Sequence, residues 1–397
     1  MSRRPFLERL MPLGIPLAWL QLTAERKRFA AAVAGITFAV TMMLFQSGLH
    51  TALFQQVLTP FLKLRADIYI VSAQYEYIGN IGGPRTFPAE TLWRVRALPE
   101  VDAAYPLWLS AMPLRNPETG KLRDLFVMAF EPHHRVFADA AIDAQRDKLA
   151  SGDTALMDAL AHPDFGPYAA ALATQERVHT ELNDVGLDIV GLCSIGTTFV
   201  ADGNLVTSRD AFFRVFPGMT PERVMAGVIQ LKPGSDTGAV VASLRALLPQ
   251  DVHVYSTAEM LAREKAYWSD RTPIGFVITA SMLVAMIVGA VIVYQILYTD
   301  VNDHLPEYAT LKSIGFSDGY FVRLVLQESV ILSVAGFVPG VLLALLMYHL
   351  TRTMAGMPVE LEWQNLTAVF LLALGMCMVA GALATRKLRH ANPADIV

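Results

Sequence analysis

The chain has 397 residues, of which 53% are hydrophobic and 17% charged, and its mean hydropathy is +0.39. This composition excludes an ordinary soluble protein and indicates a membrane protein that carries a soluble portion. The net charge of −4 and the pI near 6.1 provide no global basic surface, so a nucleic-acid partner is not expected.

The N-terminal region, residues 1–28, is basic and contains one short apolar stretch, Ile15–Leu22. We expect this stretch to form a helix in the membrane interface with Trp19 at headgroup depth; a disordered basic tail is the alternative. The next run, residues 29–49, carries no charge and is long enough to span a membrane. A cleaved signal peptide competes with that interpretation, but the run exceeds a usual signal-peptide core and no A-x-A-like site closes it. We therefore predict a retained first transmembrane helix at 29–49.

Residues 50–273 have the composition of a folded domain rather than that of a linker. Apolar residues alternate in some stretches, which predicts strands, and recur at helical spacing in others. The predicted order is strand, helix, strand near each end of the region: Arg65–Ser72, Pro88–Leu98 and Val101–Leu114, then Val224–Lys232, Ser235–Leu248 and Val252–Tyr255. Two β-α-β units around an insertion are typical of a split ferredoxin-like subdomain, and the inserted subdomain would comprise residues 116–222.

At each end of residues 50–273, the sequence predicts a helix that continues into the adjacent transmembrane span. His50–Thr59 extends the first span without a break until Pro60, and Thr257–Asp270 contains no glycine or proline. Together they could form a stalk that carries motion between the bilayer and the domain; simple helical connectors are an equally good interpretation. The stalk residues that we single out are Glu264, Tyr267 and Trp268.

The C-terminal third of the chain holds three further apolar spans. Residues 274–298 contain no charge over a length that crosses a hydrocarbon core of about 30 Å. Residues 299–323 then form a polar loop with a short predicted helix, Leu305–Gly315, in which Pro306 suits the first turn and Gly315 the C-terminal stop. The remaining segments are a span at 324–348, a short loop at 349–364, a span at 365–385 and a tail at 386–397.

The distribution of basic residues predicts the orientation in the membrane. Short loops that stay in the cytoplasm carry an excess of Lys and Arg. Six lie in residues 1–28, two in 299–323 and three in 386–397, against Arg352 alone in 349–364. The predicted fold is therefore an α-helical membrane protein with four transmembrane helices, cytoplasmic termini and a large α+β extracytoplasmic domain, which combines a split ferredoxin-like subdomain with an inserted subdomain.

The short helix Leu305–Gly315 has two side-chain stripes at helical spacing. One consists of Glu307, Leu311 and Ile314, and the other pairs Tyr308 with Lys312. A helix resting on lipid is one interpretation. A protein partner is favoured, because the flank is polar and aromatic and the preceding acidic residues would be repelled by anionic lipid.

The sequence shows no catalytic, nucleotide-binding or metal-binding constellation. Gly120-Lys121 is followed by Leu122 and lacks the earlier glycine of a Walker A motif, so nucleotide chemistry is expected in another chain. We expect no metal at His133-His134, because we find no further ligand at suitable spacing. No Ser/His/Asp triad or paired carboxylates stand out, so the chain is not expected to be an enzyme.

Two further features need no functional explanation or leave two interpretations open. Asp202-Gly203-Asn204, between two apolar runs, predicts a hairpin turn. Glu328, at the head of the third span, is either functional or close enough to the cytoplasm for its carboxylate to reach water.

Several stretches resemble the MacB/FtsX superfamily of ABC transporter permeases. The order of one span, a long domain and three spans, the helix pattern Glu307, Leu311, Lys312, Gly315, and the ending Asn392-Pro393-Ala394-Asp395 all resemble this superfamily. The DevC-like branch is closer still. The stretches that look like that branch are 199–208 (FVADGNLVTS), 267–276 (YWSDRTPIGF), 291–316 (VIVYQILYTDVNDHLPEYATLKSIGF) and 336–340 (GFVPG).

The resemblance implies a homodimeric permease in the bacterial inner membrane that works with a dimer of cytoplasmic ABC ATPases. ATP would be bound by that partner, and this chain would hold no cofactor. The short helix would be the coupling helix seated in the ATPase, and the stalk and outer domain would transmit its movement. Its contact residues would be Pro306, Glu307, Tyr308, Leu311, Lys312 and Gly315.

DevC-like permeases also imply a periplasmic adaptor, an outer-membrane channel and a lipid-like or amphiphilic cargo. The alternative is a signalling subunit of the FtsX kind, which regulates an extracytoplasmic hydrolase without moving substrate. Neighbouring genes for an adaptor and an ATPase would favour export.

Overall fold

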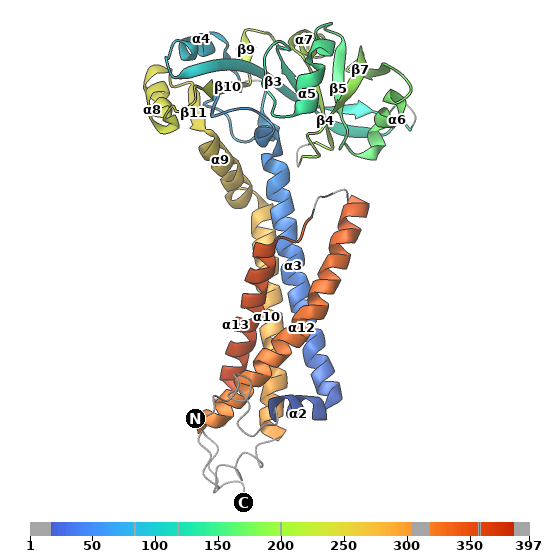
Figure 1. Cartoon of the computed structure of the whole chain (residues 1–397), viewed down its shortest axis with the longest axis vertical. Coiled ribbons are helices and arrows are strands. Elements are labelled where there is room, and N and C mark those ends of the chain that lie inside the picture. Colours follow the sequence, from blue (N-terminus) through green and yellow to red (C-terminus); the bar gives the residue numbers. More distant parts are fainter. Residues whose placement is uncertain are drawn as a thin grey trace, which may run out of the picture. The chain divides into compact units, whose positions relative to one another are not determined.

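The structure is a computed structural model that describes residues 17–82, 85–116, 119–198, 201–303, 318–355, 357 and 359–384 (Figure 1). The chain divides into two units. We call Met1–Ala52 with Phe276–Val397 the membrane unit, and Leu53–Gly275 the large domain. The predicted helix Leu305–Gly315 and the tail 386–397 lie outside the described residues.

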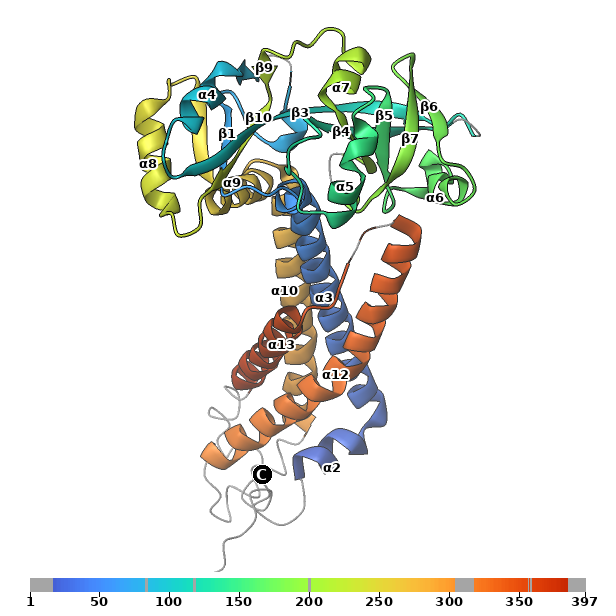
Figure 2. The same cartoon turned by 45° about the horizontal axis from the view of Figure 1, so that its top comes forward.

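The described part of the membrane unit contains four helices that are long and apolar enough to cross a membrane. They are α3 (Arg26–Leu62), α10 (Pro273–Asp303), α12 (Asp318–Ala355) and α13 (Trp363–Ala384). A shorter helix, α2 (Leu17–Ala24), precedes them and lies across one end of the long helices in Figures 1 and 2. The predicted four-span architecture is confirmed.

Small residues bring α3 and α12 into close contact. A Cβ atom on Gly336 would lie 2.5 Å from Cγ2 of Ile36, which is closer than atoms can approach. The hydroxyls of Thr37 and Thr41 donate hydrogen bonds to the carbonyl oxygens of Gly336 and Gly340, each over 3.2 Å. Within lipid, helices associate through such close packing and interhelical hydrogen bonds. The GFVPG stretch therefore forms a helix contact.

One nine-stranded sheet forms the centre of the large domain, in the order β11-β1-β10-β3-β4-β8-β5-β7-β6. Its first four strands are antiparallel and alternate with two helices along the chain, which is the ferredoxin-like arrangement. This confirms the predicted split subdomain. Its elements are β1 (Ile68–Ser72), α4 (Glu90–Arg96), β3 (Val101–Arg115), β10 (Ala226–Leu231), α8 (Thr237–Leu247) and β11 (Val252–Ser256).

The inserted half continues the same sheet. Its strands are β4 (Leu122–Phe130), β5 (Thr154–Asp158), β6 (Val178–Leu182), β7 (Val185–Cys193) and β8 (Gly203–Ser208). Its helices are α5 (Ala140–Gln145), η2 (Arg146–Leu149), η3 (Pro163–Phe165), α6 (Tyr168–Leu172) and α7 (Arg209–Val215). The short β2 (Phe87–Pro88) and β9 (Arg223–Val224) pair separately, and η1 (Ile78–Asn80) follows β1.

The strand β3 belongs to both halves of the domain. Its first half pairs with β10, with Leu107 opposite Ala226, and its second half pairs with β4, with Trp108 opposite Ala129. A strand of 15 residues extends about 50 Å, long enough to serve two sets of neighbours. Figure 2 shows β3 running across the domain. The insertion is thus joined to the ferredoxin-like half by a shared strand.

The hairpin predicted at Asp202-Gly203-Asn204 is wrong. Gly203 and Asn204 begin β8, which lies between β4 and β5. The amide of Asn204 is fully buried and donates to Oδ2 of Asp158 over 2.7 Å. That carboxylate also accepts hydrogen bonds from the backbone N–H groups of Ile195 and Gly196. A distant acidic side chain therefore binds the side-chain amide nitrogen of a residue that local sequence assigns to a turn.

Candidate functional site

The helix that precedes the second span, α9 (Thr257–Asp270), has a well-defined start. The Ser256 hydroxyl accepts a hydrogen bond from the Glu259 backbone N–H, and the Glu259 carboxylate accepts one from the Ser256 N–H. This capping box satisfies two backbone donors at the helix terminus. Arg245 of α8 adds an ion pair to Glu259 over 2.8 Å. The helix is thus anchored to the end of β11 and to α8.

One face of α9 is buried in the large domain. Met260, Glu264 and Trp268 lie on this face, since residues four apart share one side of a helix. Glu264 is fully buried. One of its carboxylate oxygens accepts a hydrogen bond from the Tyr75 hydroxyl, and the other accepts one from the Ile78 backbone N–H over 3.4 Å. A stalk residue predicted from sequence therefore has specific partners in the segment after β1.

Burial changes the acidity of this pair. It raises the pKa of Glu264 to about 7, although the hydrogen bonds from Tyr75 and Ile78 and the charge of Arg263 act in the opposite direction. Burial, and then the Glu264 carboxylate, raise the pKa of the Tyr75 hydroxyl. Arg263 donates to the Tyr75 carbonyl oxygen over 2.8 Å, which ties the same segment to α9. Glu264 thus titrates near neutral pH.

Aromatic rings extend the contact toward the end of α9. The Tyr77 and Tyr267 rings stack with centroids 4.4 Å apart, and Trp268 meets Tyr77 edge-on at 5.4 Å. Such arrangements are favourable beyond the apolar area that they bury. The structure therefore brings all three predicted stalk residues against Tyr75 and Tyr77. Sequence reasoning missed these two tyrosines, although the Tyr-x-Tyr pair directly after a predicted strand was a signal.

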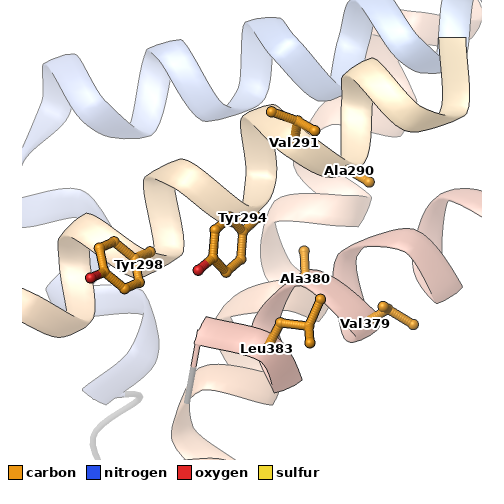
Figure 3. A pocket seen from close by; sticks show the side chains of 7 residues that line it. All are labelled: Ala290, Val291, Tyr294, Tyr298, Val379, Ala380 and Leu383. Carbon is orange, nitrogen blue, oxygen red and sulfur yellow. The ribbon is translucent and has the colours of Figure 1, made fainter. Parts of the chain in front are cut away.

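A second feature lies in the membrane unit, where α10 and α13 border an apolar groove of about 510 Å³ (Figure 3). A neighbouring hollow of about 360 Å³ shares Ala290 and Val379 with it. The only polar side-chain groups in the groove lining are the hydroxyls of Tyr294 and Tyr298. The groove is lined by Ala290, Val291, Tyr294, Tyr298, Val379, Ala380 and Leu383. Its surface suits an acyl chain or an apolar helix.

Polar side chains also lie inside the membrane unit. Glu328, Ser329 and Ser333 of α12 are fully buried. A Cβ atom on Gly381 of α13 would lie 2.2 Å from the Ser329 hydroxyl oxygen, so the two helices are closely packed there. The Glu328 side chain is therefore buried rather than exposed in this structure. Ionisable residues in such positions are costly and are usually retained for function.

The other candidate residues divide into two groups. The predicted coupling-helix residues Pro306, Glu307, Tyr308, Leu311, Lys312 and Gly315 all lie outside the described residues, so their role stays a prediction. Within the described ranges, one group of side chains converges closely enough to hold a metal ion: Glu131, His133 and His134 of the large domain.

One segment of the membrane unit matches a family of known proteins. Residues 279–393 match the family described as FtsX-like permease C-terminal, and this segment includes α12, α13 and most of α10. The macrolide export ATP-binding/permease protein MacB of Sodalis glossinidius (strain morsitans) is 21% identical over 401 residues. The alignment covers 96% of this chain but only 60% of that protein, so the chain spans about 60% of its curated relative.

Two solved structures are similar to about half of this chain. The periplasmic region of MacB from Actinobacillus actinomycetemcomitans matches with 11% identity and a TM-score of 0.33, over 49% of this chain and 91% of that one. The extracellular domain of the transporter YknZ from Gram-positive bacteria matches with 11% identity and a TM-score of 0.33, over 48% and 99%. Through its permease segment, its curated relative and its four apolar helices, the chain is similar to the MacB/FtsX superfamily of ABC transporter permeases.

Proposed function

We propose that the chain is the permease subunit of an ATP-driven exporter, working as a homodimer with two copies of a separate cytoplasmic ATPase. The observation that carries this proposal is the FtsX-like permease segment at 279–393 in a chain whose sequence has no Walker A motif. ATP would be bound and hydrolysed by the partner, and this chain would convert the partner's movement into work on the far side of the membrane.

The proposed orientation follows from the charge of the short loops. Basic residues concentrate in 1–28, 299–323 and 386–397, which puts both termini and the coupling segment in the cytoplasm. The large domain then lies in the periplasm of a bacterial inner membrane. Reporter fusions at Gly120 and at the C-terminus test this orientation. A cytoplasmic signal from the fusion at Gly120 would contradict it.

The proposed mechanism uses the continuity of the chain around α10. This helix ends at Asp303, just before the predicted coupling helix, and begins at Pro273, with two residues between it and the end of α9. A helix transmits axial displacement because its hydrogen bonds form an unbroken ladder. Movement of the coupling segment would therefore be passed through α10 to α9.

The proposed cargo is lipid-like or amphiphilic, delivered through a periplasmic adaptor and an outer-membrane channel. The resemblance to the DevC-like branch supports this cargo, and the apolar groove between α10 and α13 is compatible with it. The uncharged lining of the groove accepts apolar chains, because burial of such chains is favoured and no desolvated charge opposes it.

The central experiment tests the coupling helix. Glu307→Arg and Leu311→Asp each place an unmatched charge at the proposed ATPase contact, and we expect both to abolish copurification and stimulated ATP hydrolysis while the permease still inserts. Glu360→Arg is the matched control, because it makes the same charge change at an exposed residue in the short loop on the other side of the membrane. Normal copurification and stimulated hydrolysis in both coupling variants would contradict the proposed contact.

The same preparation separates export from signalling. Reconstituted vesicles that hydrolyse ATP and also move a fluorescent lipid across the membrane support an exporter. Coupled hydrolysis without transport, in a system that instead activates a periplasmic hydrolase, would replace the export proposal with an FtsX-like signalling role.

A further inference from the structure

A short turn directly after β4 brings three metal-ligating side chains together. The turn consists of Glu131, Pro132, His133 and His134, and the His134 backbone N–H donates to the Glu131 carbonyl oxygen over 2.9 Å. Proline is favoured at the second position of such a turn because its ring presets φ. The first and fourth side chains of the turn therefore approach each other for local reasons.

The distances between the donor atoms match those around a metal ion. Nε2 of His134 lies 3.1 Å from Oε2 of Glu131, and Nε2 of His133 lies 3.5 Å from the same oxygen. All three donor atoms lie within 4.8 Å of one another. With metal–ligand bonds of about 2.0–2.1 Å, two ligands of a tetrahedral Zn²⁺ ion are roughly 3.3 Å apart. The observed separations fall on either side of that value.

The surrounding residues hold the turn in place. The Arg146 guanidinium donates to the Pro132 carbonyl oxygen over 3.2 Å, and the Gln230 amide donates to the Arg135 carbonyl oxygen over 2.9 Å. Just beyond the turn, the Val136 carbonyl oxygen accepts a hydrogen bond from the Arg65 backbone N–H over 2.8 Å. These contacts come from separate elements, so the ligand positions are preorganised and a bound ion need not order the loop.

Neighbouring side chains also orient two of the three ligands. Arg209 contacts Oε1 of Glu131 over 3.3 Å and leaves Oε2 facing the histidines. The Tyr105 ring packs on His134 with centroids 4.2 Å apart and holds the orientation of that imidazole.

We propose that Glu131, His133 and His134 form a binding site for a divalent transition-metal cation of the Zn²⁺ class. Two imidazoles and one carboxylate suit zinc, copper or nickel better than calcium or magnesium, which prefer oxygen ligands. Three protein ligands leave a fourth position open to solvent, because His133 is 69% exposed. We expected no metal at the histidine pair from sequence, but Glu131, two residues before His133, provides the third ligand.

The experiment measures metal binding to the full chain, purified in mild detergent without a polyhistidine tag. Equilibrium dialysis with Zn²⁺ should retain one more equivalent in the wild-type chain than in His133→Ala. Co²⁺, used as an optical probe, should give the visible absorption of a tetrahedral site and be displaced by Zn²⁺. His133→Ala, His134→Ala and Glu131→Gln should each weaken binding about tenfold or more, because changes even behind a ligand cost that much.

His179→Ala is the matched control, since His179 is an exposed histidine that contacts a carboxylate, Asp188, over 3.1 Å, and no third ligand joins them among the described residues. It should bind metal like the wild-type chain. Removal of the exposed His133 side chain leaves the sheet intact, and circular dichroism without metal verifies this for each variant. Zinc retention unchanged in folded His133→Ala and His134→Ala, or no stoichiometric binding by the wild-type chain, would overturn the proposal.

Discussion

The two units differ in the large side chains that they leave exposed. In the large domain the biggest residues are inside, including Trp108, Phe126 and Phe130. In the membrane unit, large apolar side chains such as Phe276 and Leu342 are 74% and 63% exposed, and glycines allow the closest helix contacts. The large domain gains stability by removing apolar surface from water, but lipid offers the membrane helices no such gain, so close backbone packing holds them together.

The helix α9 comes shortly before α10 along the chain, and its interruption should have the largest effect on function. We predict that a short Gly-Ser insertion between Lys265 and Ala266 abolishes export while ATPase binding persists, because flexible residues absorb displacement and separate Glu264 from Tyr267. Export and ATP hydrolysis are measured in the same membranes. An insertion of equal length in the exposed turn at Gly234 is the control. Undiminished export would show that α9 connects the large domain to the second span without transmitting movement.

Truncation of a large core residue should strongly destabilise only the large domain. Trp108 lies where β3 passes from β10 to β4, and its indole N–H donates to the Arg223 carbonyl oxygen over 3.1 Å. We expect Trp108→Ala to lower the free energy of unfolding of that domain by about 3–5 kcal/mol. Proteolysis over a denaturant series measures this loss. Trp93→Ala is the control because that side chain is 67% exposed. Equal losses would contradict the assigned core.

The buried carboxylate Glu264 predicts a pH dependence of stability. Its pKa is about 7 in the folded domain and 4.5 ordinarily, so the folded state binds its proton more tightly. Stability from this group is complete below about pH 4.5 and is lost as the pH rises to about 7, by roughly 3 kcal/mol. Glu264→Gln should remove this loss, as read from thermal unfolding midpoints at pH 5 to 8. Glu259→Gln is the control on the same helix.

The pKa of the control residue Glu259 is shifted in the opposite direction to that of Glu264. Hydrogen bonding from Ser256, and then the Arg245 charge, lower the pKa of Glu259, so its contribution is present above its ordinary pKa and is lost at lower pH. A Glu264→Gln variant that retained the full loss of stability between pH 5 and 7 would rule out Glu264 as its source.

In the membrane unit, the substitution expected to destabilise is the enlargement of a small residue. In the large domain it is the truncation of a large one. Gly336→Val places methyl groups against Ile36, and we expect a cost of about 1–3 kcal/mol from overpacking. Unfolding of the full chain in detergent provides the measurement. Gly375→Val is a matched control, because nothing lies within 4 Å of a Cβ atom at that position. If the control were as destabilised as Gly336→Val, close packing of α3 on α12 would not explain the effect.

Exposed ion pairs should matter little in either unit, which gives the smallest predicted effect. Arg28 pairs with Asp303 in the membrane unit, and Arg245 pairs with Glu259 in the large domain. All four side chains are more than a third exposed, so Asp303→Asn or Arg245→Gln should change stability by less than about 1 kcal/mol. A larger loss in one unit, measured by the same unfolding assays, would show that its pair is screened from solvent.

Sequence predicted those parts of the fold that depend on neighbouring residues. The four apolar spans and the six elements of the ferredoxin-like half were recognisable because their periodicity is local. The shared strand β3 and the position of β8 depend on pairing between distant segments, which spacing does not reveal. Within the candidate site, α9 was predicted from its composition, but the contact of Glu264 with Tyr75 joins residues 189 positions apart.

The double pairing of β3 limits how this domain can be divided. Removal of residues 116–222 would delete β4 and leave the half of β3 from Trp108 to Arg115 with a row of unpaired N–H and C=O groups. Such an edge is a template for pairing with another chain. The insertion therefore also protects the ferredoxin-like half from aggregation, and a chimera that exchanges it with a relative must keep a strand that pairs with this part of β3.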